Sequence, residues 1–290
     1  MTMAPGGAAG AAGAAAQPPP ELLFRLKVRL GPAVREVWRR RELVRTLAER
    51  DLRVRYKQAI LGFAWSILTP LALMLVFTVF FQRVARVDTG KAPYALFAYL
   101  GLLPWTFFST SVSLGGQSLV TNNQLVNKVY CPREVFPLAS MGVAAADGLL
   151  ATLVLGLLFA ITGFAPKATA VWLPLLLVVQ VAFTFGVTLV ISAVLVFLRD
   201  LRHLLPIILQ LGLFATPVAY GMNVVAPSLQ VVYSAANPLA PVIDGYRRTI
   251  LYGQAPDWHL LGPGAFTAVA LLAVGYVVFK RLEPGFADYA

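Results

Sequence analysis

Positively charged side chains are the most numerous groups in this sequence that could do chemistry, and they are unevenly distributed. Of its 24 Lys and Arg residues, 12 lie before Gln58, and the net charge of the chain is +11. A basic balance often indicates nucleic-acid binding. This basic cluster, however, directly precedes a long apolar run, as do the cationic flanks of membrane-spanning helices, which bind anionic lipid headgroups. We therefore expect membrane lipids, and not nucleic acid, to be partners of this region.

A single carboxylate, that of Asp147, interrupts the apolar run 135–161. An ionisable group at membrane depth is costly, so it usually forms hydrogen bonds to other groups or takes part in transport. Residues 144–146 are alanines and Gly148 follows, and such small residues let helices pack closely. The pattern favours a structural role in hydrogen bonding across helices, with a direct role in transport as the alternative.

The sequence lacks the motifs of the common catalytic and metal sites. It has one cysteine, Cys131, and two histidines, His203 and His259, that lie far apart. This excludes an intramolecular disulfide and predicts no metal site. There is no G-x-x-x-x-G-K-[ST] phosphate-binding loop, no G-x-S-x-G and no H-E-x-x-H. We predict no catalytic residue, metal or cofactor in this chain, so energy for any transport must come from another subunit.

The elements that position these groups are predicted to be helices in a membrane. Apolar residues make up 58% of the chain and charged residues 13%, with a mean hydropathy of +0.73. Six uncharged or nearly uncharged runs are long enough for a helix of about 17–25 residues to cross a bilayer. They are 60–81, 94–114, 135–161, 172–198, 204–220 and 263–279. Continuous runs, unlike short alternating ones, exclude a β-barrel. The predicted fold is an all-α membrane protein with six transmembrane helices.

The distribution of basic residues between the spans predicts the orientation. If the N-terminus lies inside, 18 of the 24 Lys and Arg residues fall in inner segments and 6 in outer loops. Basic residues favour the cytoplasmic side. We therefore predict a multi-pass membrane protein with both termini in the cytoplasm.

Two segments precede the transmembrane domain, which is predicted to occupy 58–290. Residues 1–20 are almost entirely Ala, Gly and Pro, which predicts a disordered tail. Residues 21–57 are polar and are predicted to hold the cytoplasmic interface and the approach to the first span. Within them, 34–50 has apolar residues on one helical face, which predicts an amphipathic helix in the headgroup plane rather than a plain charge cluster.

Two further segments are more than simple connections. The loop 115–134 is polar, and its middle is predicted to be a short helix that Thr121 or Asn122 caps and Pro132 ends. The stretch 222–261 is apolar but contains four prolines. Irregular backbone at membrane depth survives only where protein covers it or it lines a cavity. We predict a pair of short re-entrant helices on the outer side.

Aromatic residues within the spans could line a channel, because their faces stack on the C–H faces of sugars. The candidates are Phe63, Trp65, Phe214 and Tyr220. Many other aromatic residues lie at span ends, where an interfacial belt is the simpler interpretation.

Four segments, in this order along the chain, resemble the permease subunits of type-two ABC exporters, in the Wzm-like branch that exports O-antigen, capsule, teichoic acid and related glycans. The first is R-V-R-Y-K-Q-A-I-L-G-F-A-W at 53–65, with L-T-P at 68–70. The second is L-V-N-K-V-Y-C-P-R-E at 125–134, with F-P-L at 136–138. The third is R-D-L-R-H at 199–203 with T-P-V at 216–218, and the fourth is N-P-L at 237–239 with Tyr246 and Arg247. Ala59, Asn127 and Cys131 depart from the residues common in that family.

The resemblance implies a channel formed by two copies of the chain, with two separate ATPase subunits that bind ATP and Mg²⁺. A gate near the diphosphate headgroup of a lipid-linked glycan is implied for Arg53, Arg55, Tyr56 and Lys57, because Arg forks bind phosphate in two places. The segment 122–134 is implied to be a coupling helix that docks into the ATPase. Its candidate contacts are Leu125, Val126, Lys128, Tyr130, Pro132, Arg133 and Glu134. Spans one and five are implied to line the pore.

Two other functions share parts of this pattern. A drug or antibiotic exporter of the same superfamily would have the same fold. A membrane-embedded glycan enzyme or a flippase acting alone would need reactive groups in its loops, and the largest outer loop holds Asp244, Arg247, Arg248 and Asp257. Within the exporter interpretation, O-antigen, capsule, teichoic acid and galactan are all compatible with the sequence.

Overall fold

The computed structural model describes residues 39–57, 64–84, 89–90, 92–128 and 131–286, and its regular elements there are all helices. The longer helices are α2 (Arg41–Tyr56), α3 (Ala64–Phe77), α4 (Tyr94–Thr121), α6 (Val135–Thr162), α7 (Leu173–Phe197), α8 (Leu201–Ala215) and α11 (Trp258–Leu282). The shorter ones are η2 (Thr78–Val84), α5 (Asn123–Lys128), η3 (Ala168–Trp172), η4 (Met222–Val224), α9 (Gln230–Ala236), α10 (Leu239–Arg247), η5 (Arg248–Tyr252) and η6 (Glu283–Gly285). The predicted all-α fold is confirmed. The tail predicted for 1–20 lies outside the described residues.

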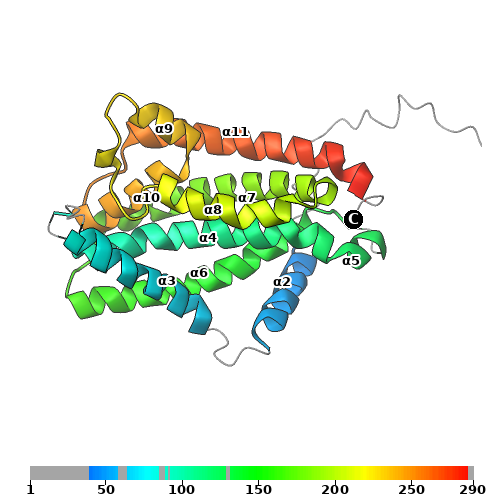
Figure 1. Ribbon diagram of the computed structural model, residues 1–290, viewed down its shortest axis with the longest axis horizontal. Helices are drawn as coiled ribbons and strands as arrows, with labels where there is room; N and C mark the ends of the chain where they lie inside the picture. Colours follow the sequence, from blue (N-terminus) through cyan, green and yellow to red (C-terminus); the bar gives the residue numbers. More distant parts are fainter. Residues whose placement is uncertain (1–38, 58–63, 85–88, 91, 129–130, 287–290) are drawn as a thin grey trace, which may run out of the picture.

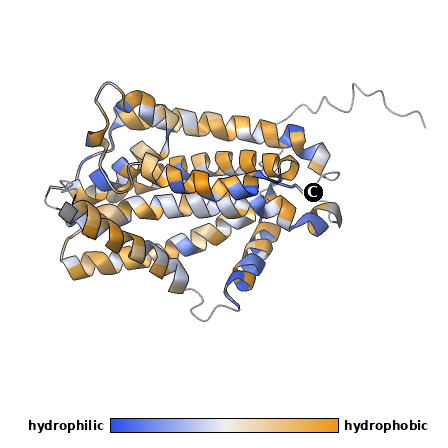
Figure 2. Cartoon of the chain, viewed as in Figure 1, coloured by the Kyte–Doolittle hydropathy of each residue, from blue (hydrophilic) through white to orange (hydrophobic). Residues whose placement is uncertain are grey.

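Helix α4 lies at the centre of a bundle whose long helices run along the longest axis of the molecule (Figure 1). It packs against α6 and α7 and also contacts α3, α8 and α10. Its apolar side chains are therefore largely buried, among them Leu96, Tyr99 and Leu102. The peripheral helix α3 instead exposes Leu75 and Val76. Figure 2 shows apolar residues over the bundle and a hydrophilic α2, as expected when lipid is the main solvent of the bundle.

In the described part of the chain, five helical segments are long and apolar enough to cross a membrane. They are Ala64–Phe81, Tyr94–Thr121, Val135–Thr162, Ala168–Phe197 and Trp258–Gly285. These correspond to five of the six predicted spans. The helix at 94–121 continues seven residues beyond its predicted end, because the polar residues after Leu114 still form regular helix.

The helix found at the predicted span 204–220 is too short to cross a membrane. Helix α8 has 15 residues, which cover about 22 Å at about 1.5 Å per residue, less than the about 30 Å of a bilayer core. The helix ends at Ala215 because Thr216 is extended (φ −98°, ψ 144°) and precedes Pro217, and a residue before proline is disfavoured in helical geometry. The prediction placed the end of this helix five residues too late.

The short helices α9 and α10 form the pair predicted in the proline-rich stretch. Helix α10 contacts α4, α7 and α11, while α9 contacts α11. Leu239, Val242 and Ile243 of α10 are buried in the interior. Protein therefore covers α10, which is the condition for irregular backbone at membrane depth, whereas α9 is mostly half-buried and exposes Val232.

Helices α7 and α11 approach each other closely at two glycines. A Cβ atom added to Gly275 would lie 2.6 Å from the carbonyl oxygen of Gly186, which is too close for any side chain. Small residues at such crossings let helix backbones pack against each other without a hydrophobic driving force.

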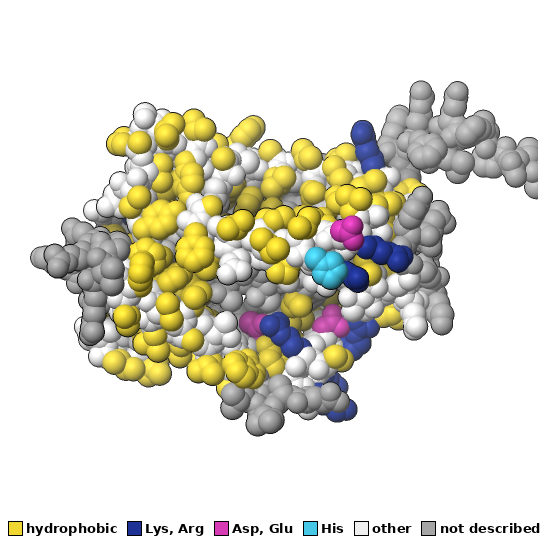
Figure 3. All heavy atoms as spheres, in the orientation of Figure 1, with side chains coloured by type: hydrophobic (Ala, Val, Ile, Leu, Met, Phe, Trp, Pro, Cys, Tyr) yellow, Lys and Arg dark blue, Asp and Glu magenta, His cyan; other side chains and the backbone are white. Residues whose placement is uncertain are grey.

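Charged side chains are concentrated toward one end of the bundle. Figure 3 shows a largely apolar surface, with Lys, Arg, Asp and Glu gathered toward the end where Figure 1 places α2, α5 and the end of α11. A site for a polar or charged ligand is therefore expected at this end of the bundle.

Candidate functional site

Helix α2 crosses the bundle at a steep angle and rests on α6 (Figure 1). Leu47 is buried, and Leu43, Val44 and Ala48 pack against the same cluster. This is the apolar face that the sequence predicted for the second half of 34–50, and it is covered by protein. Residues 34–38 of the predicted helix lie outside the described residues.

The carboxylate of Asp147 on α6 connects three helices. Nη1 of Arg55 at the end of α2 donates to Oδ2 of Asp147 over 3.0 Å. The hydroxyl of Ser66 on α3 donates to Oδ1 over 3.0 Å, and the hydroxyl of Tyr56 donates to the same oxygen. The hydroxyls of Tyr56 and Ser66 lie 2.7 Å apart. The hydrogen bonding across helices that the sequence favoured for Asp147 is present, and its partners include two of the predicted gate residues.

The two sides of this ion pair differ in burial. The side chain of Asp147 is 10% exposed, whereas that of Arg55 is 41% exposed. Burial and the hydrogen bond to Asp147 raise the pKa of Tyr56, so its hydroxyl stays protonated and can donate. The site is thus the buried carboxylate of Asp147, which accepts hydrogen bonds from two hydroxyls and pairs with the partly exposed guanidinium of Arg55.

A cavity of about 140 Å³ adjoins this cluster. Besides Arg55 and Asp147, its lining includes Trp65, Ser66, Thr106 and Thr110. An aromatic face, hydroxyls and an arginine are groups that hydrogen-bond or stack on sugars and phosphates.

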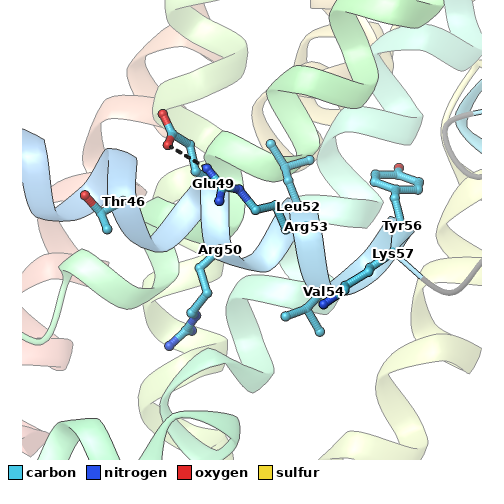
Figure 4. Close-up of a pocket in the computed structure, with 8 residues that line it drawn as sticks. All are labelled: Thr46, Glu49, Arg50, Leu52, Arg53, Val54, Tyr56 and Lys57. Atoms are coloured by element: carbon cyan, nitrogen blue, oxygen red, sulfur yellow. Dashed lines mark ion pairs between the residues drawn. The ribbon is translucent and has the colours of Figure 1, made fainter.

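The other two predicted gate residues lie at the surface near the end of α2. Arg53 and Lys57 are exposed and, with Glu49 and Arg50, line an open depression of about 800 Å³ along α2 (Figure 4). Arg53 lies 3.9 Å from the carboxylate of Glu49, a weak surface contact. The gate stretch therefore presents one arginine to the interior and two cations to the surface.

Arg50 ties α2 to the start of the predicted coupling segment. Its guanidinium pairs with Asp51 at 2.7 Å and also donates to the side-chain oxygen of Asn122. Asn122 in turn donates to the carbonyl of Ser118 and precedes α5. The short helix predicted in this loop is present, with Val126 buried and Leu125 half-buried. Tyr130 and the side chain of Lys128 lie outside the described residues.

The end of the coupling segment is bound to the C-terminal helix. Glu134 is 1% exposed and pairs with Lys280 at 2.7 Å, and the hydroxyl of Tyr276 donates to it over 3.1 Å. Arg133 donates to the carbonyl of Glu283, and the neighbouring Pro132 is half-buried. Glu134 is thus buried and connects the start of α6 to α11, and its carboxylate is not exposed for docking.

The candidate channel aromatics occupy separate positions. Trp65 is 52% exposed and lines the cavity beside Asp147, while Phe214 is 56% exposed on α8. Tyr220 is half-buried, and its hydroxyl donates to the carbonyl of Phe214 over 3.0 Å. Phe63 lies outside the described residues. Figure 3 shows how widely apolar side chains cover the visible face, so exposure alone does not distinguish a channel from lipid.

The sequence placed Arg247 in the fourth motif and among the loop groups of the enzyme alternative but did not predict its burial, and it is the most deeply buried cation described. It is 2% exposed and donates to the carbonyls of Phe97 and Val218, and over 2.8 Å and 2.9 Å to those of Pro217 and Tyr220. Its guanidinium also stacks on the ring of Phe97, 3.6 Å from the centroid. It anchors the irregular segment after α8 to α4. The proline-interrupted segment, rather than the arginine itself, was the signal in the sequence.

The family model of the ABC-2 type transporter matches residues 42–251, and the chain belongs to this family. The matched region contains the Asp147 cluster, the coupling segment and Arg247. The protein is therefore a membrane transporter component of the ABC-2 type.

Curated relatives resemble the chain over most of its length. It is 32% identical to an O-antigen export system permease of Myxococcus xanthus, over 88% of this chain and 98% of that protein. It is 30% identical to an O-antigen export system permease of Klebsiella pneumoniae, over 85% and 94%. A polysialic acid transport protein of Escherichia coli is 22% identical over 83% and 93%.

Proposed function

We propose that the chain is the channel-forming permease of an ATP-driven exporter of lipid-linked polysaccharide, in the bacterial plasma membrane with both termini in the cytoplasm. The observation that carries this proposal is the match, over nearly the full length, to permeases named for O-antigen export. The family alone would also suit a drug exporter, but these relatives favour a glycan.

Two copies of the chain are proposed to form the channel, with two separate ATP-binding subunits that hold ATP and Mg²⁺. The missing phosphate-binding loop supports a separate ATPase. Large exposed apolar side chains on α8, such as Ile207, Leu211 and Phe214, give a surface that a second copy or lipid must cover.

The surface cations of α2 are proposed to receive the anionic headgroup of the substrate. Arg53 and Lys57 are exposed at the end of this helix, next to the depression along it. Guanidinium and ammonium groups bind phosphate oxygens strongly, arginine in a bidentate manner. Aromatic residues such as Trp65 would then contact the sugars that follow.

The coupling segment is proposed to carry the motion of the ATPase into the membrane domain. Helix α5 would dock on the ATPase, and the two ends of the coupling segment 122–134 contact other helices. Asn122 contacts Arg50 on α2, and Glu134 pairs with Lys280 on α11. Movement of α5 would therefore be transmitted to both α2 and α11.

The test is ATP hydrolysis by the full chain co-purified with its ATPase in lipid nanodiscs, with and without lipid-linked glycan. We expect glycan to stimulate hydrolysis, and Arg133→Ala to separate hydrolysis from export, because Arg133 holds the coupling segment to Glu283. If no ATPase co-purifies and glycan turnover proceeds without ATP, the chain is instead a flippase or enzyme that acts alone.

A further inference from the structure

The Asp147 cluster holds its two carboxylate oxygens in different ways. Oδ1 accepts hydrogen bonds from Tyr56 and Ser66. Among the described residues, Oδ2 accepts one from Arg55 alone. If Arg55 left, Asp147 would still have two hydroxyl donors. The buried charge would therefore not be left without partners, which is the usual reason why a buried ion pair cannot open.

Arg55 is the partner that can leave. Its side chain is 41% exposed, and Nη1 is the nitrogen that donates to the carboxylate. A guanidinium has five N–H donors and prefers oxyanions that it can grip in two places. A diphosphate offers more oxygens and more charge than a single carboxylate oxygen, so it can compete for the same cation.

We infer that Asp147 is an internal counter-ion that competes with the diphosphate headgroup of the substrate for Arg55. Binding of the headgroup transfers Arg55 from Asp147 to the phosphate oxygens and weakens the contact between the end of α2 and α6, where the hydrogen bond from Tyr56 to Asp147 is kept. Asp147 is thus a positioning residue that sets how much anionic headgroup is needed to draw Arg55 away from α6. This inference rests on the proposed function, and it adds a residue on α6 to the site on α2.

The chain contains a matched control for this inference. Asp51 is also an acid that pairs with an arginine of α2, Arg50, at 2.7 Å. Asp51→Asn removes the same charge from the same region as Asp147→Asn, but it leaves the Arg55 contact intact. A general change in surface charge would affect both variants equally.

The experiment measures ATP hydrolysis by the full chain with its ATPase in nanodiscs, as a function of added polyprenyl diphosphate. Without a competing carboxylate, Asp147→Asn is expected to lower the half-saturating concentration by roughly threefold to tenfold, the range that corresponds to one hydrogen bond of ordinary net strength. Asp51→Asn is expected to leave it unchanged. A merely structural defect would reduce the maximal rate and would not make the response more sensitive. An unchanged or higher half-saturating concentration in Asp147→Asn would overturn the inference.

Separate arms identify the source of the anion. Soluble inorganic diphosphate and nanodiscs rich in anionic phospholipid replace the polyprenyl diphosphate in turn. Sensitisation of the response to the polyprenyl diphosphate supports the inference, and sensitisation to the other two alone contradicts it. If the wild type does not respond to any of them, the proposed function fails instead.

A charge exchange covers the case in which Asp147→Asn does not fold. The double variant Arg55→Asp with Asp147→Arg keeps an ion pair between α2 and α6 but moves the cation onto α6. We expect recovery of thermal stability relative to Arg55→Asp alone, without recovery of stimulation by diphosphate. Recovery of both would mean that only the ion pair matters and would overturn the inference.

Discussion

Arg55 and Arg247 both contact groups in the interior of this protein, and their partners differ in kind. Arg55 is 41% exposed and meets a carboxylate, whereas Arg247 is 2% exposed and donates to four backbone carbonyls. The guanidinium of Arg247 donates to all four carbonyls at once, which holds both α4 and the irregular segment in fixed positions around its planar group. A single contact at the surface can be exchanged for another anion. Arg247 therefore stabilises the fold, whereas Arg55 can exchange its partner and bind a substrate.

The largest effect is expected for Arg247→Leu. Removing the guanidinium leaves buried carbonyls without donors, and each acceptor left unsatisfied costs about 1–3 kcal/mol. The variant should yield little folded protein, or unfold about 10 °C earlier in detergent by fluorescence-detected size-exclusion chromatography. Arg248→Leu, at the partly exposed neighbour, should change the midpoint little. Equal losses in the two variants would contradict the anchoring role of Arg247.

Gly101→Ala tests the same anchor without removing the arginine. A Cβ atom at Gly101 would collide with Nη2 of Arg247 and the carbonyl oxygen of Val218. Overpacking of this kind costs about 1–3 kcal/mol. Gly148→Ala, next to Asp147, meets nothing within 4 Å and should be neutral or stabilising. A thermal midpoint for Gly101→Ala equal to that of wild type would show that the packing around Arg247 is loose.

Arg55→Ala should separate stability from activity. A half-exposed ion pair contributes about 1 kcal/mol or less, and Asp147 keeps its hydroxyl donors, so the thermal midpoint should fall only slightly. Stimulation of ATP hydrolysis by lipid-linked glycan should fall at least about tenfold, because a phosphate-binding cation is lost. A variant that unfolds like Arg247→Leu would remove the distinction between the two arginines.

The smallest effect is expected for Ser66→Ala. It removes one of three donors to Asp147 and should destabilise the protein by about 0.5–1.5 kcal/mol. Because Arg55 and Tyr56 still hold the carboxylate, the maximal rate of ATP hydrolysis should be retained. A loss of activity as large as in Arg55→Ala would indicate that Ser66 itself contacts the substrate.

The sequence predicted the helices and the hydrogen bonding of Asp147, but not the partners of Arg55 or the role of Arg247. Continuous apolar runs gave the helices of the bundle, and the lone carboxylate in a span gave hydrogen bonding at Asp147, because a charge in lipid must find partners. The partners themselves were not predictable, since Arg55 and Asp147 are 92 positions apart. Arg247 was missed because its partners are backbone carbonyls, which every residue carries.

The predicted coupling segment illustrates a further limit. Its short helix followed from local signals, and the structure contains it as α5. Glu134 was assigned with its neighbours as a contact to the ATPase, but it is buried against Tyr276 and Lys280. A motif identifies which residues belong together, whereas burial decides which of them a partner can reach.

Export of a glycan is tested most directly by depletion of this chain in its native host. Labelled polysaccharide is then followed on the cell surface and in the inner-membrane lipid fraction. The account predicts that surface polysaccharide falls while lipid-linked glycan accumulates inside, and that wild-type but not Arg55→Ala protein restores export. Unchanged surface polysaccharide without internal accumulation would contradict the proposed function.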